Sequence, residues 1–198
     1  MATVLTLGGL SFGIGTEQRM AKALKGLAMQ EGNVHKPVPY PQSASVSSIH
    51  AGEVAIGNAI KETEGPKIVL AFSQGAQVVG EWLKNNADSL DAPPPNELSF
   101  MLIGNPERRY GRKPNSRGFD GQLLPYTPDN TQYKVTDIAR RWDGWCNADN
   151  WPDDPGWFAS MRLFFGQWVD HSDYSKVDTT KCGVRAVEGN TRYLVAPN

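Results

Sequence analysis

The sequence predicts an α/β fold with a mainly parallel central sheet, because short apolar strands alternate with amphipathic helices along the chain. The near-continuous apolar run at 67–72 supports this, since it is typical of a parallel strand buried on both faces. The size also fits, because 198 residues with 39% hydrophobic and 21% charged side chains suit one globular domain over 1–198. Ligands of such sheets bind at the carboxyl ends of the strands.

The first third of the chain supplies two strands and two helices. A β-rich run at 3–7 stops at Gly8-Gly9, and a second strand at 34–38 is interrupted by prolines. Between them, a helix that Thr16 can cap is predicted by apolar side chains at helical spacing: Met20, Ala23, Leu24, Leu27 and Ala28. The helix after the second strand has one apolar stripe: Val46, Ile49, Ile56 and Ile60.

The rest of the chain continues the alternation. The strand at 67–72 leads into a helix carrying Val78, Val79, Trp82 and Leu83. Further strands are expected at 98–103 and 133–139, the latter as the last core strand, followed by an aromatic helix over 157–169. The long segment 105–131 is rich in Gly and Pro, and we expect it to be a loop that covers the site. Its basic run at 107–113 is interpreted as a solvated loop.

Charge and composition exclude several classes of function. The net charge is −1 and the isoelectric point is about 6.3, whereas nucleic-acid binding needs a basic field. No apolar run approaches the roughly 18 residues of a membrane span. The amino terminus lacks the basic region of a secretory signal, so we expect synthesis in the cytoplasm. Cys146 and Cys182 are expected as unpaired thiols, and the scattered histidines predict no metal site and no cofactor.

The chemistry is expected at Ser73, in the run Ala71-Phe72-Ser73-Gln74-Gly75. In a nucleophile elbow of the form G-x-S-x-G, a strand turns sharply into a helix and displays the serine hydroxyl. Here Ala replaces the first Gly, but the required strand precedes Ser73 and a helix follows it. The alternative is a serine that only caps the helix. The elbow narrows the prediction to a three-layer α/β-hydrolase fold.

A nucleophilic serine needs a base and a carboxylate that orients the base. The order in this fold is serine, acid, histidine, and among the histidines only His171 follows Ser73. The acid is expected after the strand 133–139, where Asp143 and Asp149 are both candidates and Asp143 is favoured. The oxyanion donors are predicted to be the backbone N–H groups of Gln74 and Leu10, with the Ser11 hydroxyl as a further donor.

Several short motifs together resemble a known family, the cutinase-like esterases. The elbow Phe72 to Gly80, Tyr40-Pro41 and Ile103 to Arg108 are similar to the lysin B esterases of mycobacteriophages. The Trp142 to Trp145 motif, the His171 to Tyr174 segment and the closing run Asn190 to Pro197 resemble the esterase domain of mycobacterial PE and PPE proteins. In the family pattern the oxyanion loop carries a Gly-Thr pair, whereas here Leu10 follows Gly9.

The resemblance implies a serine esterase acting on lipid or glycolipid esters through a Ser-Asp-His triad, without a metal. Lysin B enzymes cleave the ester that joins mycolic acids to arabinogalactan, so the resemblance also implies release to the bacterial cell envelope or carriage on a phage particle. Two other interpretations remain: a binding or virion structural protein that has lost its chemistry, and acyl transfer to a sugar. The aromatic residues between Trp142 and Trp168 are expected either to line an acyl-chain groove or to lie in the core. Acyl chain length and oligomeric state stay open.

Overall fold

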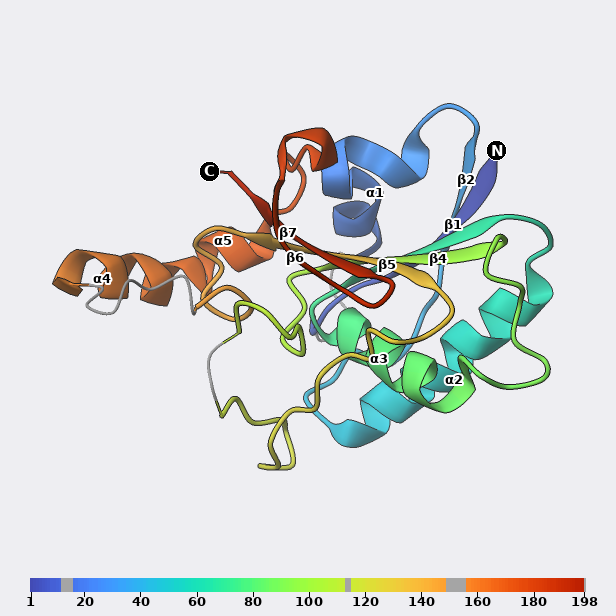
Figure 1. Ribbon diagram of the computed structural model, residues 1–198, viewed down its shortest axis with the longest axis horizontal. Coiled ribbons are helices and arrows are strands. Elements are labelled where there is room, and N and C mark those ends of the chain that lie inside the picture. Colours follow the sequence, from blue (N-terminus) through green and yellow to red (C-terminus); the bar gives the residue numbers. More distant parts are fainter. Residues whose placement is uncertain (12–15, 113–114, 149–155, 198) are drawn as a thin grey trace.

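The computed structural model describes residues 1–11, 16–112, 115–148 and 156–197, and these form an α/β fold around one sheet (Figure 1). Within these residues the sheet has seven strands in the order β2-β1-β3-β4-β5-β7-β6. The strands are β1 (Ala2–Leu7), β2 (Asn33–Pro37), β3 (Lys67–Phe72), β4 (Leu98–Ile103), β5 (Lys134–Arg140), β6 (Gly183–Glu188) and β7 (Thr191–Ala196). Neighbours pair in parallel except β6 and β7, so the prediction of a mainly parallel sheet is confirmed.

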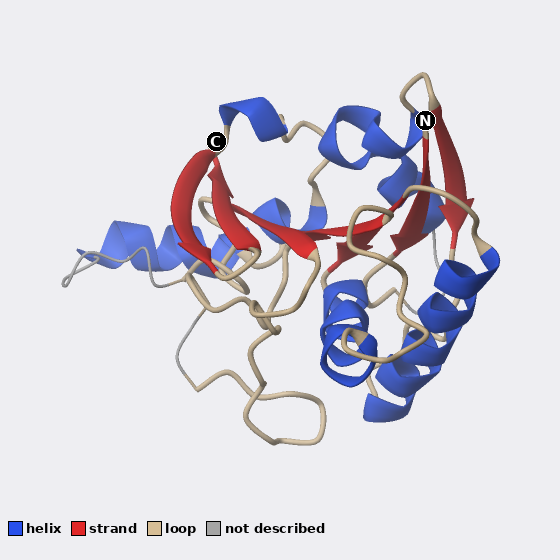
Figure 2. Ribbon diagram, turned by 45° about the vertical axis from the view of Figure 1, so that its right-hand side comes forward, coloured by secondary structure: helices blue, strands red, loops and turns tan. Residues whose placement is uncertain are grey.

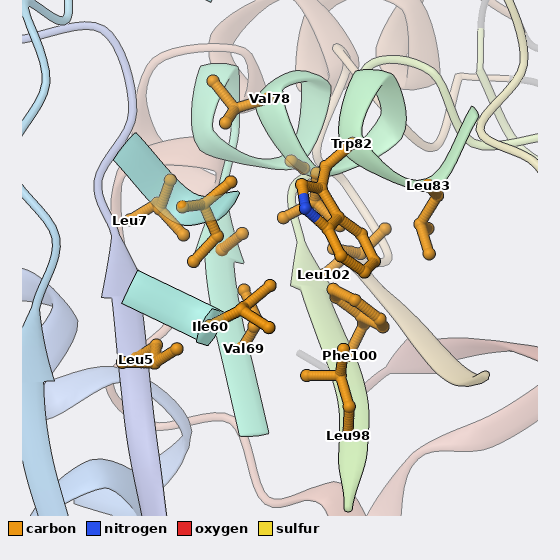
Figure 3. Packing of buried hydrophobic residues seen from close by; sticks show 14 of the residues in the cluster. Leu5, Leu7, Ile60, Val69, Val78, Trp82, Leu83, Leu98, Phe100 and Leu102 are labelled. Carbon is orange, nitrogen blue, oxygen red and sulfur yellow. The ribbon is translucent and has the colours of Figure 1, made fainter. Parts of the chain in front are cut away.

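Helices cover both faces of the sheet (Figure 2). They are α1 (Thr16–Gly26), η1 (Leu27–Met29), α2 (Val46–Glu62), α3 (Gln74–Asn86), α4 (Gly156–Gly166), α5 (Val169–Ser172) and η2 (Thr179–Lys181). The side chains of β3 alternate between two cores, with Val69 facing α2 and α3 and Leu70 facing α1. Figure 3 shows the first core, in which Trp82 of α3 packs against Phe100 of β4. No helix in the described ranges is long and apolar enough to cross a bilayer.

The predicted strand 133–139 is not the last core strand. After α5 the chain forms a hairpin, in which β7 pairs in parallel with β5 and β6 closes the edge. Gly189 supplies the left-handed turn of this hairpin, with φ of 52°. Sequence reasoning missed β6 because nearly all of its residues are exposed, so it has no apolar alternation.

The predicted helix over 16–28 is interrupted. Ala23 leaves helical geometry, and Leu24 and Lys25 have positive φ angles of 52° and 56°. Their backbone N–H groups instead donate to the carbonyl oxygens of Tyr174 and Ser175, at 3.0 Å each. Tertiary hydrogen bonds therefore override the helical spacing of the apolar side chains at this point.

The solvated loop predicted at 107–113 is wrong for the residues that are described. Arg108 is fully buried, and its guanidinium lies 3.5 Å from the Asp137 carboxylate of β5. Asn105 donates to the same carboxylate at 2.7 Å. Arg108 therefore belongs to a buried polar network with Asn105 and Asp137. The local sequence alone does not predict this network, because Asp137 lies on a distant strand. The segment 105–131 is a loop as expected, with one β-bridge between Arg117 and Leu123, and its covering role stays a prediction.

Candidate active site

The turn between β3 and α3 holds Ser73 in a strained backbone conformation, with φ of 53° and ψ of −114°. Its N–H still pairs with the carbonyl oxygen of Ile103 on β4, at 3.0 Å. A Cβ atom at Gly75 would lie only 2.7 Å from the carbonyl oxygen of Leu7, so a glycine is needed where α3 meets β1. Ser73 occupies the N-cap position of α3 but makes no capping bond with its side chain, so the capping alternative does not hold.

The Ser73 hydroxyl is instead hydrogen-bonded to a histidine. His171 lies in the short helix α5, and its Nε2 is 2.9 Å from Ser73 Oγ. The Phe72 ring packs against the imidazole with a centroid separation of 5.0 Å. Gly104 lies under the ring, where an added Cβ would come within 3.0 Å of His171 Cε1. The imidazole is therefore fixed from two sides.

Asp143 completes the chain of hydrogen bonds. It follows β5, is fully buried, and places Oδ2 2.8 Å from Nδ1 of His171. The other candidate acid, Asp149, lies outside the described residues. The structure thus brings together Ser73, His171 and Asp143 in the order expected of nucleophile, base and acid, and their catalytic roles stay a prediction.

The Asp143 carboxylate is held in its ionised form. Tyr174 donates its hydroxyl to Oδ2 at 2.7 Å, and the Trp145 backbone N–H donates to Oδ1 at 3.0 Å. Burial alone would raise the pKa of Asp143, but the attraction of His171 and hydrogen bonds from His171 and Tyr174 outweigh burial and hold this pKa below its ordinary value. Burial, reinforced by the Asp143 charge, raises the pKa of Tyr174 well above its ordinary value, so this phenol stays a donor.

A cluster of ion pairs around the buried Asp170 carboxylate anchors the helix that carries the histidine. Asp170 is 1% exposed and pairs with Arg140, at 2.9 Å, and with Arg162. Arg140 also donates to the carbonyl oxygen of Asp173 at 3.0 Å. Sequence reasoning missed these supporting residues and Tyr174, because their partners lie far along the chain. The signal available was the position of Asp170 next to His171, and that of Tyr174 in the segment that resembles the family.

The predicted oxyanion loop is held against the elbow. A Cβ atom at Gly9 would lie 2.9 Å from Ser73 Cβ, so the loop passes directly over the serine. The Tyr40 hydroxyl donates to the carbonyl oxygen of Gly8 at 2.7 Å, which fixes the loop from outside. The N–H groups of Leu10 and Gln74 stay the predicted donors. The Ser11 hydroxyl donates to Gln42 Oε1 at 2.6 Å, which contradicts its expected role as a further donor to the oxyanion.

The chain also matches a known family. A family model of the PE-PPE domain aligns with residues 32–198, which is most of the chain. The chain belongs to the PE-PPE domain family. This membership confirms the resemblance indicated by the sequence motifs. Both cysteines of this PE-PPE domain are free, as expected from the sequence.

Two relatives from Mycobacterium tuberculosis have names that describe acyl chemistry. The chain is 31% identical to the SL1278 acyltransferase Chp1 over 154 residues, covering 76% of this chain and 37% of the relative. It is 32% identical to the esterase PE16 over 165 residues, covering 74% of this chain and 28% of the relative. The chain therefore spans only about a third of the length of these relatives.

Solved structures confirm the cutinase-like α/β-hydrolase fold. A cutinase-like protein from Cryptococcus sp. superposes with a TM-score of 0.54 at 20% identity, covering 75% of this chain and 79% of the other. Lysin B from mycobacteriophage D29 superposes with a TM-score of 0.52 at 18% identity, covering 83% of this chain and 73% of the other. At these identities the likeness establishes the fold and not the substrate.

Proposed function

We propose that this domain is a serine esterase that acts on lipid esters through an acyl-enzyme. The observation that carries the proposal is the unbroken chain of hydrogen bonds from Ser73 Oγ through His171 to the buried Asp143 carboxylate. The esterase PE16 among its relatives and the cutinase-like fold support the same reaction class.

The reaction follows from the positions of these groups. His171 Nε2 takes the proton of Ser73 as Oγ attacks the ester carbonyl carbon, and the carbonyl oxygen becomes an oxyanion facing the N–H groups of Gln74 and Leu10. The ionised Asp143 stabilises the imidazolium, which then gives its proton to the departing alcohol. Water attacks the acyl-enzyme in the second half, with His171 again as base, and this releases the carboxylic acid and the free serine.

Replacing the nucleophile tests this proposal. Ser73→Ala should lower kcat/KM for a p-nitrophenyl ester by at least about a thousandfold, because it removes the attacking oxygen. Ser47→Ala, at an exposed position on α2, is the matched control and should keep full activity. A fluorophosphonate probe should label the unaltered chain and not Ser73→Ala. An unlabelled and inactive wild type would instead indicate a binding or structural protein that only keeps the fold.

The finer proposal is that the natural ester is a mycolyl ester of the mycobacterial envelope, cleaved by an enzyme of the lysin B kind, either released to the envelope or carried on a phage particle. It is supported by the sequence motifs shared with lysin B enzymes and by relatives from a mycobacterium. Incubating the chain with mycolyl-arabinogalactan should release free mycolic acid, whereas Ser73→Ala should release none. A wild type that hydrolyses p-nitrophenyl esters but releases no mycolic acid would contradict this finer proposal alone.

A second candidate function is acyl transfer to a sugar, which the SL1278 acyltransferase among the relatives favours. The same acyl-enzyme would then be attacked by a sugar hydroxyl in place of water, and His171 would take that hydroxyl's proton. Product analysis with trehalose present distinguishes the two reactions. An acylated sugar that appears at the expense of the free acid would establish transfer.

A further inference from the structure

The helix α4, just before the site, exposes large apolar side chains. Figures 1 and 2 both show α4 extending away from the sheet. Several aromatic side chains on α4 and in the turn after it are more than half exposed: Trp157 at 72%, Phe158 at 80%, Phe164 at 61%, Phe165 at 52% and Trp168 at 65%. Of the two alternatives for these residues, a place in the core is therefore wrong, and the acyl-chain groove stays a prediction. A contiguous apolar surface of this kind marks an interaction site on a folded protein.

These side chains share one face of the helix. At about 100° per residue, positions 157, 158, 161, 164, 165 and 168 fall within roughly a third of the helix circumference. We call this set, which includes Met161, the aromatic face. An amphipathic helix on a protein surface normally turns its apolar face toward the core. On α4 the orientation is reversed, because the aromatic face points to solvent.

The opposite side of α4 explains this orientation. Leu163 lies there and is 5% exposed. A Cβ atom at Gly166 would collide with the carbonyl oxygen of Trp142, and one at Gly144 would collide with that of Leu163. The helix thus contacts the domain through the side that carries Leu163 and Gly166, and no larger side chain could replace Gly166 there. The exposure of the aromatic face follows from this packing.

The charges around the aromatic face indicate its partner. Over residues 156–169 the sequence contains one charged side chain, Arg162, and no acidic one. The neighbouring Asp170 is buried and paired, so it adds no exposed negative charge. The guanidinium groups of Arg141 and Arg162 lie 5.3 and 5.7 Å from the Trp142 ring centroid. Asp153 and Asp154 precede this stretch in the sequence, but the aromatic face itself carries no acidic residue and has Arg141 and Arg162 beside it, which suits the surface of an anionic lipid layer.

Trp145 lies between the end of α4 and the site. Trp145 is 46% exposed, and its indole N–H donates to the carbonyl oxygen of Gln167 at 3.1 Å. The Trp145 ring lies 6.4 Å from the imidazole of His171, between centroids. Trp145 therefore connects the turn after α4 with the ring that faces Ser73.

We propose that the aromatic face docks this domain onto an anionic lipid surface. Docking would insert the aromatic side chains among the acyl chains and leave the arginines at the headgroups. It would hold Ser73 and His171 beside the lipid layer, where an ester of a long acyl chain would be found. Only this last consequence rests on the proposed esterase function. Binding to the lipid surface does not depend on esterase activity.

Vesicle binding tests docking without catalysis. The full chain carrying Ser73→Ala is sedimented with vesicles of phosphatidylcholine and phosphatidylglycerol in equal amounts, and with vesicles of phosphatidylcholine alone. Adding Trp157→Gln, Phe158→Gln and Phe164→Gln together should weaken binding by about tenfold per side chain, or about a thousandfold in all. The matched control replaces the exposed Phe119 and Leu90 by Gln and should bind as before. Phe158→Gln alone serves if the triple variant fails to fold.

The outcomes separate the alternatives. The proposal predicts stronger binding to anionic than to neutral vesicles, with loss in the α4 variants. It is overturned if the unaltered face binds neither vesicle, or if the triple variant binds as well as its parent. It is also overturned if the chain binds no vesicle and sedimentation velocity shows a dimer that the triple variant loses, because a second copy would then cover the face.

A second measurement separates docking from catalysis. With Ser73 intact, the triple variant should keep its rate on water-soluble p-nitrophenyl acetate and lose at least about tenfold on a long-chain ester in vesicles. Vesicle binding by a chain with no esterase activity would contradict the proposed function and leave docking standing.

Discussion

The hydroxyl of Tyr174 offers a test of how the acid is held. Tyr174→Phe removes one oxygen atom and keeps the ring, which packs 6.0 Å from Phe72. The change deletes the 2.7 Å hydrogen bond to Asp143 Oδ2 and leaves the Arg140 N–H, 3.1 Å from the phenol oxygen, without its acceptor. The contacts of the carboxylate with His171 and with the Trp145 N–H are untouched.

The magnitude follows from the burial of the charge. A hydrogen bond to a fully buried carboxylate is worth about 1.5–3 kcal/mol, so we expect the variant to unfold more easily by about that amount. The same loss makes protonation easier and should raise the pKa of Asp143 above its value in the wild type. Because protonation of the Asp143–His171 pair inactivates the base, the acid limb of kcat/KM should move to higher pH. The rate at the optimum should fall by about tenfold or less, since the pair itself remains.

The assay is the pH profile of kcat/KM on a p-nitrophenyl ester, together with chemical denaturation. Tyr133→Phe is the matched control, because the Tyr133 hydroxyl also makes a 2.7 Å bond, to the carbonyl oxygen of Pro93, far from the site. The control should lose about 1 kcal/mol of stability and keep its pH profile. An acid limb in Tyr174→Phe that coincides with the wild type would refute the assigned role of this hydroxyl.

Two further substitutions probe the surroundings. Burial raises the pKa of Glu107 from 4.5 to about 7. Between these two pH values the folded chain therefore holds a proton that the unfolded chain releases. The free energy of unfolding should fall by about 3 kcal/mol as the pH rises across this window. Glu107→Gln should remove this pH dependence, which is measured by chemical denaturation at pH 5 and pH 8. If the variant loses as much stability between the two pH values as the wild type, the raised pKa of Glu107 is not its cause. Gly104→Ala should lower kcat/KM by about a hundredfold, because the added methyl group displaces His171. Gly121→Ala is the control. Gly121 also has a positive φ, but no atom lies within 4 Å of the added methyl group, so this variant should change stability alone.

Local patterns predict the strands and the turn at Ser73, but they fail where a distant partner intervenes, as in the helix interrupted at Leu24 and at the buried Arg108. Ser73 is found from sequence because an apolar strand, a sharp turn and a helix are adjacent along the chain. Sequence favours Asp143 over Asp149, and the contact of Asp143 with His171, 28 residues away, supports this choice, while Asp149 lies outside the described residues. Tyr174 is likewise 31 residues from the carboxylate that it holds.

The aromatic helix shows a different limit. The spacing of its side chains predicts an apolar face, but a helical pattern cannot say whether that face turns inward. The orientation of α4 is determined by its glycine side, because Gly144 and Gly166 allow the backbone of α4 to approach the loop after β5. Neither glycine stands out in the sequence until the two segments are brought together.

The two halves of the candidate site are stabilised in different ways. The backbone of Ser73 is strained by about 1–3 kcal/mol, and it is held because β3 pairs with strands on both sides while α3 buries most of its residues. His171 lies in a four-residue helix, which is too short to be stable on its own. Its position therefore depends on the neighbouring Asp170, which forms ion pairs with Arg140 of β5 and with Arg162 of α4. Asp170 therefore connects the exposed aromatic helix, the sheet and the imidazole. The serine side of the site is positioned by the core, whereas the histidine side is positioned by the ion pairs that two partly exposed arginines make with the buried Asp170.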